Sequence, residues 1–171
     1  MKKGSGKRKG SSFERDIARL LDKYWEAPEH TFWRTPNSGG WYEAGDVYSR
    51  DKSIWFPFIV ECKAYKTLDL LQLLTREKTT KLYIWWSQLV RERKDAIEAG
   101  RPLNTCKKLL IIKINNFPVM VVYDMKEMPK GKESIPHFRV ETKEDDILCI
   151  CLLSDFMRVF PKEYLIKTIR M

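Results

Sequence analysis

The apolar run from Ile54 to Cys62 constrains this chain most, because it ends in a carboxylate and a lysine that flank Cys62. Side chains alternate along a strand, so Glu61 and Lys63 share one face while Cys62 lies on the other. Charges held near a core are costly unless something compensates them. A divalent cation shared with the preceding Asp46 would do so. A solvated ion pair on an edge strand, worth roughly 0.2–1 kcal/mol, would need no cation.

Hydrophobic periodicity predicts helices and strands in the order helix, strands, helix, strands, which is an α/β arrangement. A Ser-x-x-Glu capping box begins at Ser11 and places Glu14 at the third position of the first helix. We expect Trp85 and Trp86 to diverge, which leaves one of them for a subunit contact. The predicted helices cover 12–25 and 79–99, with a short last helix before Pro161, and the predicted strands cover 31–35, 46–48, 54–62, 108–114, 119–123, 137–141 and 147–153.

Length and composition indicate one domain, since 171 residues of which 43% are hydrophobic can fill a single core. We expect a basic flexible tail over 1–10 and one domain over 11–171, with a core of about 11–123 and an elaboration of about 124–171. The tail has no apolar block after it and does not read as a secretory signal. The four cysteines lack zinc-ligand spacing, so reduced structural thiols in a cytoplasm are expected: Cys62, Cys106, Cys149 and Cys151.

The formal net charge of +9 favours a polyanionic partner, with nucleic acid first and an anionic membrane second. No uncharged stretch approaches the 18 or so residues that a membrane span needs, so no membrane partner is expected.

Five features follow one another in the chain: Phe13-Glu14-Arg15, Ser38, Asp46, Glu61 and Lys63. In this order they resemble the PD-(D/E)XK nuclease superfamily, and within it the archaeal and phage Holliday junction resolvases. Gly45 stands where the motif name has proline. The resemblance implies a restriction-endonuclease-like α/β fold, with a central mixed sheet flanked by helices. The carboxy-terminal β/α elaboration has no counterpart in this resemblance.

The resemblance also implies a Mg²⁺ site, in which Mn²⁺ would substitute, held by Asp46, Glu61 and the backbone carbonyl of Cys62. Lys63 would orient the attacking water and offset transition-state charge. Glu14 would bind a second metal or a metal-bound water, or would serve only the capping box. Ser38 would hold the scissile phosphate, or its loop would be only a turn. The predicted catalytic residues are thus Glu14, Ser38, Asp46, Glu61 and Lys63, and the predicted DNA-binding residues are Lys2, Lys3, Lys7, Arg8, Lys9, Arg15, Arg34 and Ser38.

The expected function is a metal-dependent, structure-selective DNA endonuclease that resolves four-way junctions by paired nicks, and paired nicks imply a homodimer. It would act in the cytoplasm, or in the host cytoplasm if phage-encoded. One alternative is a restriction-like or repair nuclease that cuts duplex, flap or single-stranded DNA. A second is a DNA-binding module on a nuclease-like fold without activity.

Overall fold

The computed structural model describes residues 5–36, 44–54, 56–68, 80–127, 137–141 and 147–169. It contains one seven-stranded sheet in the order β1-β2-β3-β4-β5-β7-β6. The elements along the chain are α1 (Ser5–Trp25), β1 (Phe32–Arg34), β2 (Val47–Ser49), β3 (Phe58–Tyr65), α2 (Lys81–Glu98), η2 (Leu103–Thr105), β4 (Lys107–Ile114), β5 (Met120–Asp124), η3 (Met125–Glu127), β6 (Phe138–Glu141), β7 (Ile147–Leu152), α3 (Leu153–Val159) and α4 (Lys162–Ile169).

The sheet is mixed, as predicted. β3 and β4 are parallel from the pair Phe58 and Lys107 to the pair Tyr65 and Ile114, and α2 connects them. The other strand pairs in the described part of the chain are antiparallel. The predicted hairpin of β4 and β5 is confirmed, and the carboxy-terminal strands β7 and β6 extend the same sheet.

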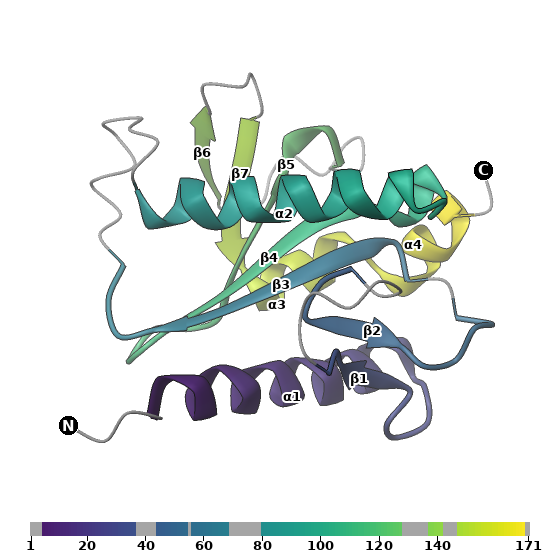
Figure 1. Cartoon of the computed structure of the whole chain (residues 1–171), viewed down its shortest axis with the longest axis horizontal. Coiled ribbons are helices and arrows are strands. Elements are labelled where there is room, and N and C mark those ends of the chain that lie inside the picture. Colours follow the sequence, from purple (N-terminus) through teal and green to yellow (C-terminus); the bar gives the residue numbers. More distant parts are fainter. Residues whose placement is uncertain are drawn as a thin grey trace.

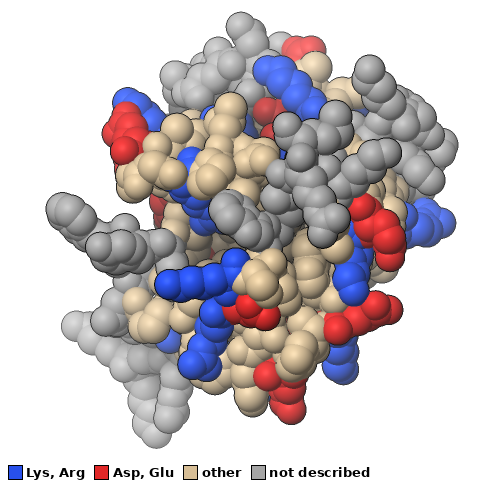
Figure 2. Space-filling model, turned by 90° about the vertical axis from the view of Figure 1, so that its right-hand side faces the viewer, with Lys and Arg blue, Asp and Glu red and all other residues tan. Residues whose placement is uncertain are grey.

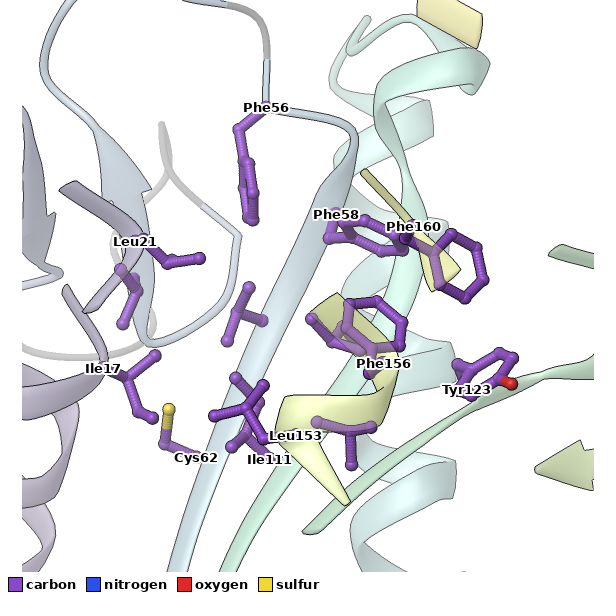
Figure 3. Packing of buried hydrophobic residues seen from close by; sticks show 14 of the residues in the cluster. Ile17, Leu21, Phe56, Phe58, Cys62, Ile111, Tyr123, Leu153, Phe156 and Phe160 are labelled. Atoms are coloured by element: carbon purple, nitrogen blue, oxygen red, sulfur yellow. The ribbon is translucent and has the colours of Figure 1, made fainter. Parts of the chain in front are cut away.

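Helices cover both faces of the sheet, with α2 on one side and α1 and α3 on the other (Figure 1). Two apolar clusters result, because alternate residues of β3 face opposite sides. Cys62 points into the cluster that contains Ile17 of α1 and Phe156 of α3 (Figure 3). Ile59 belongs to the other cluster, with Leu89 of α2. The central strand β3 is therefore held between two cores.

The first helix is longer than predicted. It begins at Ser5, so Ser11 lies inside the helix and the predicted capping box at its start is wrong. The predicted flexible tail is wrong for residues 5–10, which are helical, while residues 1–4 lie outside the described part of the chain. The basic residues of this segment extend a helix whose apolar side packs on the sheet from Phe13 onward.

Two other expectations on helices were also wrong. Trp85 and Trp86 are both buried, at 5% and 3% exposed, because the apolar face of α2 is wide enough for consecutive residues. The predicted short helix before Pro161 is confirmed as α3, but it is not the last one, since α4 follows directly and the carbonyl of Pro161 accepts a hydrogen bond from the N–H of Leu165. Within the described residues, no helix is long and apolar enough to cross a membrane.

Candidate active site

Asp46 sits just before β2, where the edge strands meet β3. Its backbone N–H donates to the carbonyl of Val60 at 2.6 Å, and its carbonyl accepts from the N–H of Thr35 at 2.9 Å. Its Oδ2 accepts from the N–H of Cys62 at 2.8 Å. Asp46 is 7% exposed. The backbone on both sides therefore fixes this carboxylate against the middle of β3.

Gly45 makes this approach possible. Its φ of +90° lies in a region that side chains with a Cβ rarely adopt, and a Cβ would meet the carbonyl oxygen of Val60 at 2.6 Å. Proline, which holds φ near −65°, does not fit here. The departure from the motif name thus has a backbone reason.

Glu61 and Lys63 share the α2 face of β3, as predicted. The Lys63 ammonium donates to Glu61 Oε1 and, at 3.2 Å, to Gln88 Oε1 of α2. Glu61 is 2% exposed. The pair does not end the strand, because β3 continues to Tyr65. Gln88 in turn donates from Nε2 to Glu92 Oε1 at 2.9 Å.

Glu14 and Arg34 approach from the other side. The Arg34 Nε donates to Glu14 Oε2, and the Glu14 side chain is 15% exposed. The charge of Glu14 contributes to the raised pKa of Asp46. The α1 carboxylate therefore adjoins the same centre, with an arginine as its partner rather than the backbone of a helix start.

The two central carboxyl groups have raised pKa values. Burial, and then the charge of Glu14, raise the pKa of Asp46 to about 6 against the opposing hydrogen bond from Cys62. Burial and the charge of Asp46 raise the pKa of Glu61 to about 7. Burial lowers the pKa of Lys63, but the contact with Glu61 outweighs it and the pKa is raised. Two buried carboxylates that repel each other favour a shared cation.

The donors present fit a small hard cation. Asp46 Oδ2 is used by Cys62, and in a strand the N–H and C=O of one residue lie on the same side, so the Cys62 carbonyl faces the Asp46 side. Carboxylate and carbonyl oxygens are the ligands that Mg²⁺ prefers, with waters completing its octahedron. In the described part of the chain, no three His, Cys, Asp or Glu side chains form a metal-binding group by themselves. The Cys62 thiol takes no part, since it points into the core and burial raises its pKa well above the ordinary value.

The structure brings together Glu14, Arg34, Asp46, Glu61 and Lys63 of the predicted site. Arg15 and Lys9 are exposed on α1. Ser38, Lys2 and Lys3 lie outside the described residues, as do the side chains of Lys7 and Arg8, although the backbone of those two is helical.

Gln88 and Glu92 were not identified from the sequence as residues of the site. They are half-buried on the side of α2 that faces Lys63. Their four-residue spacing is compatible with a shared helix face, but any surface pair on a helix has the same signal.

Basic and acidic side chains are mixed on one face of the molecule. On the face drawn in Figure 2, the described Lys and Arg side chains are interspersed with Asp and Glu. That face therefore presents no continuous basic surface among the described residues. In Figure 1 the basic start of α1 and the end of β3 lie toward the same end of the molecule.

Comparisons with known proteins place the chain in a family. The family described as "Phage putative PDDEXK endonuclease" matches residues 5–167. No curated protein matches. Among solved structures, the chain is similar to Hjc, a Holliday junction resolvase of Archaeoglobus fulgidus, at 17% identity and a TM-score of 0.39, covering 92% of this chain and 98% of that one. Since the family match spans nearly the whole chain and includes both carboxylates and the lysine of the site, the chain belongs to this family of PDDEXK endonucleases.

Proposed function

We propose that the protein is a metal-dependent DNA endonuclease that acts on four-way junctions. The observation that carries the nuclease chemistry is the convergence of Asp46, Glu61 and Lys63 at the centre of the sheet, with both carboxyl pKa values raised by burial. A module that only bound DNA would gain nothing from two buried carboxylates beside a phosphate, because they repel it.

Asp46, Glu61 and the carbonyl of Cys62 would hold Mg²⁺ or Mn²⁺, which when bound polarises the phosphate and lowers the pKa of a coordinated water. Lys63 Nζ has three donors, of which Glu61 and Gln88 each take one. The third is available to orient the attacking water or to contact the phosphate in the transition state. Glu14, whose charge acts on Asp46, would hold a further water or cation, and Arg34 offsets its negative charge.

Junction selectivity is the finer part of the proposal. It is supported by the resemblance in Phe13-Glu14-Arg15 and by the position of Glu14, whose charge acts on Asp46. Two symmetric nicks need two sites at a fixed separation, so a homodimer is part of the proposal. The exposed basic residues Lys9 and Arg15 of α1 would contact phosphates outside the cleaved bond.

A cleavage panel tests this function. A four-way junction, a flap, a duplex and a single strand of equal length are incubated with the protein in Mg²⁺, in Mn²⁺ and in EDTA. We expect paired nicks in the junction at concentrations that leave the duplex largely uncut, and no nicks in EDTA. Light scattering at the working concentration should give the mass of a dimer.

The matched variants are Asp46→Asn and Glu61→Gln, which should abolish cleavage and leave junction binding near normal, because less negative charge eases phosphate approach. Equal cleavage of junction and duplex, or the mass of a monomer in light scattering, would refute the proposal of a junction resolvase but not that of a nuclease. Binding without cleavage in any metal would favour the DNA-binding module.

A further inference from the structure

Glu92 carries a carboxylate that the chemistry above does not use. It lies one turn beyond Gln88 on α2, and its Oε1 accepts from Gln88 Nε2 at 2.9 Å. Its Oε2 is buried and has no hydrogen-bond partner among the described residues. A buried acceptor without a partner costs free energy, so the stability of α2 does not account for this residue.

The hydrogen bonds from Glu92 through Gln88 to Lys63 allow only one orientation of the Gln88 amide. A carboxylate only accepts hydrogen bonds and an ammonium only donates them, whereas an amide has one end of each kind. With Glu92 on one side and Lys63 on the other, the Gln88 amide satisfies both in one orientation, which puts Nε2 toward Glu92 and Oε1 toward Lys63. The opposite orientation would set amide hydrogens against the ammonium.

We propose that Glu92 is a positioning residue, which fixes the amide of Gln88 so that its Oε1 holds the ammonium of Lys63 in place. The inference rests on the proposed function for its catalytic consequence, since Lys63 matters to cleavage only if the protein cleaves DNA. Held between Glu61 and Gln88, the ammonium has a defined direction for its third hydrogen. Without Glu92, the amide is free to rotate and one of the two contacts that aim Lys63 is lost.

Three single variants, one double variant and one control test this. Glu92→Ala removes the acceptor, Glu92→Gln keeps an acceptor oxygen without the charge, and Gln88→Ala removes the amide. The matched control is Glu98→Ala on the same helix, where the side chain is 64% exposed and pairs only at 3.7 Å with Lys94. The thermal midpoint of each variant is recorded to check folding.

The first readout is the single-turnover cleavage rate at saturating DNA and Mg²⁺. Glu92→Ala should lose roughly tenfold to a hundredfold, as is usual when a supporting partner of a site is removed, while Glu92→Gln stays within about threefold. The double variant Gln88→Ala with Glu92→Ala should cleave no more slowly than Gln88→Ala alone, because both changes remove the same hydrogen bond from Lys63 to Gln88. Additive losses, or a Glu92→Gln rate as low as that of Glu92→Ala, would overturn the proposal.

The second readout needs neither metal nor cleavage. Amine-reactive labelling of Lys63, followed by mass spectrometry, should be roughly threefold to tenfold faster in Glu92→Ala and in Gln88→Ala, because about one hydrogen bond to the ammonium is lost. The rate should be unchanged in Glu98→Ala. If the wild type cleaves no DNA, the proposed function fails while labelling still decides the role of Glu92. An unchanged labelling rate of Lys63 in Glu92→Ala would overturn the proposed role of Glu92.

Discussion

Replacing Glu61 by Gln should stabilise the metal-free protein, and the gain should grow with pH. The pKa of Glu61 is raised from an ordinary 4.5 to about 7. Between these values the folded state holds a proton that the unfolded state has lost, so stability falls as pH rises. At about 1.36 kcal/mol for each pKa unit, ionised Glu61 destabilises the fold by about 3 kcal/mol at pH 8 and by less than about 1 kcal/mol at pH 5.

The measurement is chemical or thermal unfolding of wild type and Glu61→Gln in EDTA from pH 5 to pH 8. The gap in unfolding free energy should widen by about 2 kcal/mol over this range, or roughly 4–8 °C in midpoint for a domain of this size. Glu98→Gln is the control, because that exposed side chain has no burial to relieve. Mg²⁺ added at pH 8 should narrow the gap, since it binds the ionised carboxylates of the wild type. A gap that stays constant with pH, or a variant less stable than wild type at pH 8, would refute the reasoning.

Three further changes give separate outcomes. Lys63→Ala should lower the single-turnover cleavage rate by about 10²-fold, with little change in the salt dependence of DNA binding. Weaker DNA binding at an unchanged rate would show that Lys63 only contacts a phosphate. Gly45→Ala should lower the free energy of unfolding in urea by at least about 2 kcal/mol, because the added Cβ meets the backbone of Val60. Gly100→Ala has a similar φ of +92° but open space around the Cβ, so its loss should be clearly smaller. Equal losses would contradict the clash. Phe58→Ala should cost about 3–5 kcal/mol by the same method, since its buried ring contacts several aromatic rings, and a loss below about 1 kcal/mol would show that this core closes over the cavity.

The sheet and the centre of the site were predictable from the sequence because their signals are local. Alternation through β3 assigned Glu61 and Cys62 to opposite faces, and the structure confirms it. The start of α1 was not predictable in the same way. A Ser-x-x-Glu pattern also occurs inside a helix, and the basic residues before it have no periodicity to reveal the helical turns from Ser5 onward.

The surroundings of the site depend on tertiary contacts that no spacing encodes. Gln88 meets Lys63 because α2 crosses β3 at that point, and Arg34 meets Glu14 across a gap of twenty residues. The reason for Gly45 was likewise hidden, because it lies in the distance to the backbone of Val60 rather than in the motif.

The alternation of charged and apolar side chains along β3 also specifies the register in which β3 pairs with β4. If β3 slipped by one residue against β4 while folding, Glu61 and Lys63 would turn toward the α1 core and Cys62 would take their place. Burying two charges among rings and aliphatic chains costs several kcal/mol for each ion. The misaligned sheet is therefore disfavoured by the same residues that form the candidate site. A variant that removes these charges loses the groups of the proposed chemistry and also makes the wrong register less costly.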